Sequence, residues 1–102
     1  MSIVFDVLKE EYERNLNMQK AYKKEINSLP KGKIIRKKIG NGTYLYLLYR
    51  DKEKVITKYI GVKDKTNIKN LQYKIDKRKY LQKNLKSLIE EEKEIRKVLK
   101  LK

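Results

Sequence analysis

The chain of 102 residues contains 28 Lys or Arg and 13 Asp or Glu, which gives a formal net charge of +15 at pH 7. The sequence has no Cys, His or Trp, which excludes a thiol nucleophile, an imidazole base and a zinc site of the usual Cys/His kind. With 39% hydrophobic and 40% charged residues, we expect a single domain, residues 1–102, with a thin core. The positive excess indicates a polyanionic partner.

Residues 3–28 repeat apolar side chains at intervals of three and four, which predicts a long amphipathic helix. The apolar line passes through Phe5, Leu8, Tyr12, Tyr22 and Ile26. Asn15 and Gln19 occupy two positions of the same line, so the helix has a polar break in its middle. We expect the helix to end before Pro30, because the residue that precedes a proline is pushed out of the α region.

Residues 33–61 contain three β-rich runs separated by turn residues, which predicts a three-stranded antiparallel meander. Gly40-Asn41-Gly42 is a strong hairpin signal, because Asn and Gly tolerate the positive φ of tight turns. Asp51-Lys52-Glu53 is a weaker turn signal. The middle run places Leu45, Leu47 and Tyr49 on one face and Tyr44, Tyr46 and Leu48 on the other. We expect one face to pack on the helices and the other to meet a partner or to leave its tyrosines exposed.

Residues 65–100 predict a second long helix. Ile68, Leu71 and Ile75 form one apolar line, and a second line runs through Leu81, Leu85, Leu88, Ile95 and Leu99. Glu92 is the gap in the second line, and the phase slips by about one residue between Ile75 and Leu81. The expected fold is therefore α+β: the two helices form an antiparallel, coiled-coil-like hairpin with the β-meander at its tip.

The two expected helices differ in length. At 1.5 Å per residue the first is about 39 Å long and the second about 52 Å. If both begin at the sheet, the last two or three turns of the second helix, residues 90–102, extend beyond the first. This segment carries Ile95, Val98, Leu99 and Leu101. It would either fray or pair with another chain, and pairing would make a homodimer through the C-terminal helix.

The positive charge is confined to part of the sequence. Residues 1–30 sum to zero, residues 31–63 carry ten basic and two acidic groups, and residues 64–89 carry eight and two. One interpretation is a surface that contacts nucleic-acid phosphates, and the other is that the lysines only solvate the protein. Lysine outnumbers arginine several-fold, which favours backbone contact over base recognition.

Fifteen residues are candidate nucleic-acid contacts. The basic ones are Lys31, Lys33, Arg36, Lys37, Lys38, Arg50, Lys52, Lys54 and Lys58 in the sheet region, and Lys74, Lys77 and Arg78 in the second helix. Tyr44, Tyr46 and Tyr59 are candidates for stacking on bases or sugars, provided that the strand register turns them outward.

An enzyme is not expected. No His is present to activate a serine, there is no glycine-rich phosphate loop, and the carboxylates between Glu90 and Glu94 lie on one helix and cannot converge alone. We therefore expect no catalytic residue, no metal site and no cofactor. The N-terminal sequence lacks a signal-peptide core, and no stretch approaches the roughly 20 apolar residues that cross a bilayer, so we expect a cytoplasmic protein without a membrane partner.

Three motifs carry a resemblance. Leu29-Pro30-Lys31-Gly32, Tyr44-Leu45-Tyr46 with Tyr49-Arg50, and Tyr59-Ile60-Gly61 resemble a group of small uncharacterised bacterial and archaeal proteins with an LPxG, YxYLxYR and YIG pattern. Similar hairpins occur near the N-termini of some transposases. The resemblance implies a basic hairpin module associated with mobile or defence loci and no particular activity. In this chain Asp51-Lys52-Glu53 replaces the glycine-containing turn that is usual in the pattern.

Two functional hypotheses follow from the sequence. The first is a non-enzymatic nucleic-acid-binding accessory protein, which contacts DNA or RNA through the lysine-rich sheet and the basic first half of the second helix. The second is a protein-interaction module, either an antitoxin or inhibitor of a partner enzyme or a self-associating coiled coil.

Overall fold

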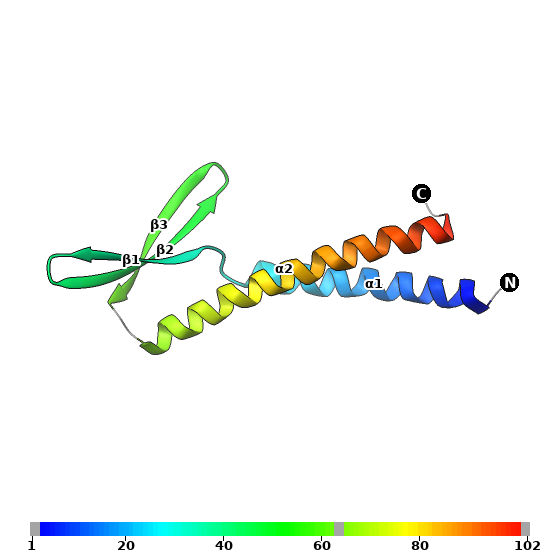
Figure 1. Cartoon of the computed structure of the whole chain (residues 1–102), viewed down its shortest axis with the longest axis horizontal. Coiled ribbons are helices and arrows are strands. Elements are labelled where there is room, and N and C mark those ends of the chain that lie inside the picture. Colours follow the sequence, from blue (N-terminus) through cyan, green and yellow to red (C-terminus); the bar gives the residue numbers. More distant parts are fainter. Residues whose placement is uncertain (1–2, 63–64, 101–102) are drawn as a thin grey trace. The chain divides into compact units, whose positions relative to one another are not determined.

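The computed structural model describes residues 3–62 and 65–100 (Figure 1). Its elements, in chain order, are α1 (Ile3–Ser28), β1 (Lys33–Ile39), β2 (Gly42–Asp51), β3 (Lys54–Val62) and α2 (Lys65–Leu99). The predicted fold class is confirmed, because an N-terminal helix, a three-stranded antiparallel sheet and a C-terminal helix follow one another, and the two helices pair as a hairpin. No helix within the described ranges is both long and apolar enough to span a membrane.

The chain divides into two compact units. We call Met1–Ser28 with Lys79–Lys102 the helical unit, and Leu29–Arg78 the sheet unit. The long helix α2 contributes its second half to the helical unit and its first half to the sheet unit.

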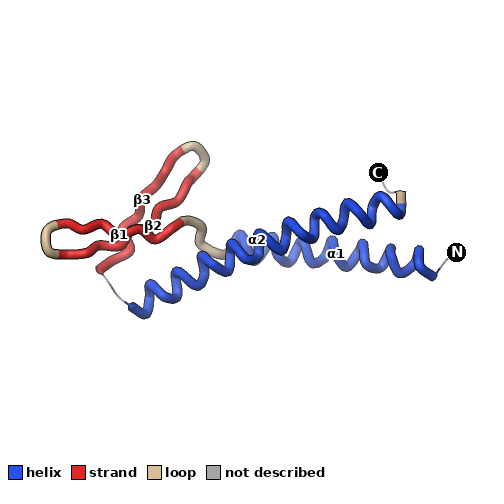
Figure 2. The backbone as a smooth tube through the Cα atoms, in the orientation of Figure 1, coloured by secondary structure: helices blue, strands red, loops and turns tan. Residues whose placement is uncertain are grey.

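In the helical unit, α1 and the second half of α2 lie side by side along the predicted apolar lines (Figure 2). Ile26 of α1 and Leu81, Ile95 and Leu99 of α2 are buried, with at most 8% of each residue exposed. The apolar side chains between them, such as Tyr22 and Leu85, are half-buried. The 3–4 spacing therefore locates the contact face of both helices correctly.

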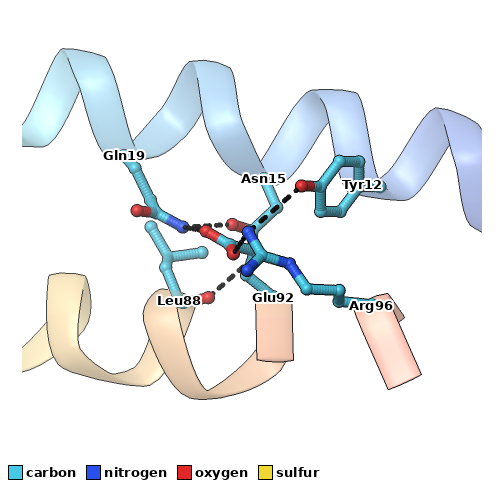
Figure 3. Close-up of polar contacts among 6 residues, drawn as sticks. All are labelled: Tyr12, Asn15, Gln19, Leu88, Glu92 and Arg96. Carbon is cyan, nitrogen blue, oxygen red and sulfur yellow. Dashed lines mark hydrogen bonds and ion pairs between the residues drawn. The ribbon is translucent and has the colours of Figure 1, made fainter. Parts of the chain in front are cut away.

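The polar breaks of the two lines meet inside the helical unit (Figure 3). Asn15 and Gln19 are 2% and 5% exposed, and the Asn15 amide donates a hydrogen bond to the Leu88 carbonyl across 2.9 Å. The Gln19 amide donates to Asn15 Oδ1 at 2.7 Å and to Glu92 Oε1 at 2.9 Å. Because the contacts of Asn15 with Leu88 and of Gln19 with Glu92 both require one alignment of the helices, the network fixes the register of the hairpin.

Arg96 extends this network toward the start of α1. Its Nη2 donates to Glu92 Oε2 at 2.7 Å and to the Tyr12 hydroxyl at 3.4 Å. The hydrogen bond with Tyr12, the electrostatic effect of Tyr12 and the charge of Glu92 raise the pKa of Arg96 above its already high usual value. The guanidinium is therefore charged at neutral pH and is a cationic partner for Glu92.

The expected overhang at the C-terminal end is wrong. Ile95 and Leu99 are buried in the helical unit, on the face of α2 that bears Glu92 and therefore meets α1. Leu101 lies outside the described residues. The additional length of α2 is its first half, which belongs to the sheet unit. The physical reason is that the apolar line from Leu81 to Leu99 matches the line of α1 in length, and the phase slip after Ile75 separates the two halves of α2.

The sheet unit has the strand order β1-β2-β3, and both pairs are antiparallel. Leu45 and Leu47 of β2 are 3% and 9% exposed, and Ile75 of α2 is 1% exposed. These three side chains are the buried apolar residues of this unit among those described, so its core lies on the leucine face of the sheet.

Two local features shape the sheet. Gly32 has φ +120°, and a Cβ there would lie 2.5 Å from the Leu48 carbonyl oxygen, so only glycine fits where the chain enters β1. A bulge between Leu45 and Tyr46 shifts the register against β3, where Tyr46 pairs with Tyr59 and Leu45 with Gly61. A bulge bends the strands and increases their twist, and the two hairpins diverge from the middle of β2 in Figure 2.

Candidate nucleic-acid interface

The strand register separates the residues of the sheet onto two faces. Tyr46 lies opposite Ile35 on β1 and opposite Tyr59 on β3, and Tyr44 lies opposite Lys37. Since neighbouring residues of a strand point to opposite faces, these residues face away from the buried Leu45 and Leu47. We call this side the tyrosine face. Its members on the described strands are Lys33, Ile35, Lys37, Ile39, Tyr44, Tyr46, Leu48, Arg50, Val55, Thr57 and Tyr59.

The three tyrosines that sequence analysis singled out are packed together on this face. The ring centroids of Tyr46 and Tyr59 are 5.5 Å apart with the planes at 61°, and those of Tyr44 and Tyr59 are 6.4 Å apart at 49°. Edge-to-face and tilted arrangements of this kind are the favourable geometries for aromatic pairs. Tyr59 is 51% exposed, whereas Tyr44 and Tyr46 are half-buried.

Cations accompany the tyrosines. Lys37 Nζ lies 4.9 Å from the centroid of the Tyr46 ring, within the range of a cation–π interaction. Lys33, which pairs with Leu48, and Arg50 are exposed on the same face, and both lie beyond the Tyr46 end of the cluster. The side chain of Arg50 makes no hydrogen bond or ion pair with any described residue, so its guanidinium is available for an anion.

The remaining basic candidates of the sheet do not lie on the tyrosine face. Arg36 and Lys38 of β1 and Lys54 and Lys58 of β3 share the face of Leu45 and Leu47. All four are exposed, because they lie on the two edge strands and flank the buried leucines. Lys31 and Lys52 are exposed in the connections before β1 and after β2. The sheet is therefore basic on both faces and at its edges.

The candidates on α2 differ from one another. Lys74 is exposed, and Lys77 is half-buried. Arg78 Nη1 donates a hydrogen bond to the Leu29 carbonyl at 2.7 Å, which ties α2 to the segment that leads into β1. Arg78 therefore has a structural contact within the sheet unit, in addition to any role at a ligand.

Sequence reasoning missed two exposed aromatic residues on α2. Tyr73 and Tyr80 are 65% and 64% exposed. They are seven residues apart on one helix, so they lie on the same side of it. Their exposure could have been predicted, because neither tyrosine falls on the apolar line of Ile68, Leu71 and Ile75.

The charge differs strongly between the two units. The sheet unit contains fifteen basic and four acidic residues, a net +11, and the helical unit contains thirteen and nine, a net +4. Carboxylates do not gather for metal binding: residues 3–62 and 65–100 contain no group of three or more Asp or Glu side chains placed to hold an ion. The arrangement on the sheet suits a polyanion with flat aromatic or sugar groups.

The comparisons with known proteins place this chain in a family. A family described as Domain of unknown function (DUF6788) matches residues 7–70. The chain belongs to this family. The DUF6788 match covers most of α1, all three strands and the beginning of α2, so it includes the whole tyrosine face. No curated protein and no solved structure gives a significant match to the chain.

Proposed function

We propose that this DUF6788 protein binds nucleic acid through the tyrosine face of its sheet, mainly by contacts with the phosphate backbone. The observation that carries the proposal is the packed cluster of Tyr44, Tyr46 and Tyr59 with Lys37 beside it. This cluster is turned away from the buried leucines, in the unit that holds most of the net charge. It combines the two features that a nucleic acid requires, cations for phosphates and aromatic surface for nucleotides.

The contacts would be largely electrostatic. Lysine side chains that neutralise phosphates release condensed counterions, so the affinity should fall steeply as the salt concentration rises. Lysine is a point charge and lacks the planar fork with which arginine recognises guanine. The preference for sequence should therefore be weak. The basic residues of the edge strands would add contacts at the margins of the face.

The structure removes the observation that favoured the alternative, self-association through the C-terminal helix. It rested on an apolar overhang, and Ile95 and Leu99 are instead buried in the helical unit. A role as an antitoxin or inhibitor, and a place in a mobile or defence locus, rest on the motif resemblance. The charge and the aromatic cluster of the sheet unit favour nucleic acid as the partner.

Binding can be measured by fluorescence anisotropy with labelled DNA and RNA at several salt concentrations. Lys33→Glu with Lys37→Glu reverses two charges on the tyrosine face, and Lys20→Glu with Lys24→Glu reverses two exposed charges on α1 as a matched control. We expect the first variant to weaken binding by about tenfold or more at low salt, and the control to weaken it much less. Equal losses in the two variants, or no binding by the wild-type protein even at low salt, would overturn the proposal.

A further inference from the structure

The three tyrosines of the cluster are not equally available to a ligand. Lys37 lies over the ring of Tyr46. The ring of Tyr44 lies against Gly42, where an added Cβ would come within 3.1 to 3.2 Å of three of its atoms. Tyr59 is the ring with half of its surface exposed, and it leans on both of the others. Tyr59 is thus a supported aromatic surface that is open to solvent.

The sheet holds Tyr59 in this position. The register of β2 against β3 shifts between Leu45 and Tyr46. As a result, Tyr59 pairs with Tyr46, whereas Gly61 pairs with Leu45. Bulges commonly re-aim a side chain at a binding site. Two aromatic contacts restrict the movement of the Tyr59 ring, so little conformational entropy would be lost when a planar group stacks on it.

The chemistry of the ligand follows from this geometry. A base can stack on an exposed ring only if it is not already stacked on both sides within a duplex. Lys33, Lys37 and Arg50 lie on the same face as Tyr59 and could neutralise the phosphates on either side of the stacked nucleotide. The bases of a duplex are already stacked on one another, so a duplex would contact these cations only through its phosphate backbone.

We infer that the tyrosine face binds unpaired nucleotides and that Tyr59 is the residue on which a base stacks. This inference rests on the proposed function and adds the class of nucleic acid to it. Single-stranded DNA or RNA, or the unpaired part of a structured RNA, is then the ligand. Duplex DNA binds more weakly and by charge alone.

The test compares a labelled single strand of about 15 nucleotides with the duplex of the same sequence, at the same salt concentration. Wild-type protein should bind the single strand at least tenfold more tightly. Tyr59→Leu keeps an apolar side chain but removes the ring, and should weaken single-strand binding by about tenfold while duplex binding stays unchanged. Tyr59→Phe should retain the wild-type preference. Tyr73→Leu, which removes an equally exposed tyrosine from α2, is the matched control and should have no effect on the preference.

The absence of Trp from the chain gives a second readout. Tyr59→Trp introduces a single indole at the site, and its fluorescence should be quenched by the single strand and much less by the duplex. Equal affinity for both ligands, or an unquenched indole in a protein that binds the single strand, would overturn the inference and leave the proposed function standing. No binding to any nucleic acid at low salt would overturn both.

Discussion

In the helical unit the amides of Asn15 and Gln19 are buried and bonded across the hairpin, whereas in the sheet unit the charged side chains of Lys33, Lys37 and Arg50 are exposed on the tyrosine face. The first unit uses its hydrogen-bonding capacity within the protein. In the second unit these cationic groups are exposed to solvent. The distribution of charge follows the same division, since the net charge is +4 in the helical unit and +11 in the sheet unit, where acidic residues are scarce.

The polar side chains of the two units therefore contribute differently to stability. A buried polar network makes one register of two helices more favourable than the alternatives. It needs satisfied partners, and Asn15, Gln19 and Glu92 supply them to one another. An exposed cluster of cations and aromatics contributes little to the stability of the sheet, and its self-repulsion opposes folding. A polyanion would relieve that repulsion, so ligand binding should stabilise the sheet unit in particular.

The largest expected effect is the loss of the sheet unit itself. Gly32→Ala places a Cβ 2.5 Å from the Leu48 carbonyl oxygen at φ +120°, so β1 and β2 cannot pair as they do. We expect a loss of about 3 kcal/mol in the free energy of unfolding, measured by urea denaturation with circular dichroism.

Gly61→Ala is the control for Gly32→Ala. Gly61 has φ +129° but nothing within 4 Å of the position of its Cβ. The change should cost only the backbone strain, about 1 to 2 kcal/mol. An equal loss in both variants would show that the contact with the Leu48 carbonyl is not what requires glycine at position 32.

A smaller loss is expected from the polar network of the helical unit. Glu92→Ala removes one of the two acceptors of the buried Gln19 amide, and a buried N–H left without a partner costs about 1 to 3 kcal/mol. Gln19→Leu combined with Glu92→Leu replaces both partners with apolar side chains and should restore part of that loss, because Asn15 Oδ1 then loses its donor. Thermal unfolding of the three proteins checks the order, which would be contradicted if the double variant were less stable than Glu92→Ala.

The smallest expected effect concerns the second hairpin turn. Gly40 and Lys52 are the first residues of the two hairpin turns, and their φ values are 61° and 57°. Glycine adopts this conformation without strain and lysine does not, so Lys52→Gly should stabilise the protein by about 0.5 to 1 kcal/mol. A rise in the melting temperature would agree with this, and an unchanged or lower value would contradict it. Lys38→Gly, within β1, should lower the melting temperature.

The elements of this fold are predictable from the sequence because their signals are local. The 3–4 spacing, Pro30 and the Gly40-Asn41-Gly42 turn act over a few residues, and each element lies where those signals placed it. The sequence also revealed that Asn15, Gln19 and Glu92 interrupt apolar lines. It did not reveal that the interruptions meet, because that depends on the relative register of two helices far apart in the chain.

The candidate site was only partly predictable for the same reason. The alternation in β2 separates Tyr44 and Tyr46 from Leu45 and Leu47, but the choice of the buried face comes from tertiary packing. The register shift beside Tyr46 is a property of strand pairing. The sequence therefore could not separate Lys37 from its neighbour Lys38, which lies on the opposite face.

This last pair provides the most direct test of the central claim, that the tyrosine face binds nucleic acid. Lys37→Glu and Lys38→Glu change the same charge at adjacent, exposed positions on opposite faces of β1. Anisotropy with labelled single-stranded DNA at low salt should show a loss of about tenfold for Lys37→Glu and of less than about threefold for Lys38→Glu. Equal losses, or a greater loss for Lys38→Glu, would contradict the assignment of binding to the tyrosine face.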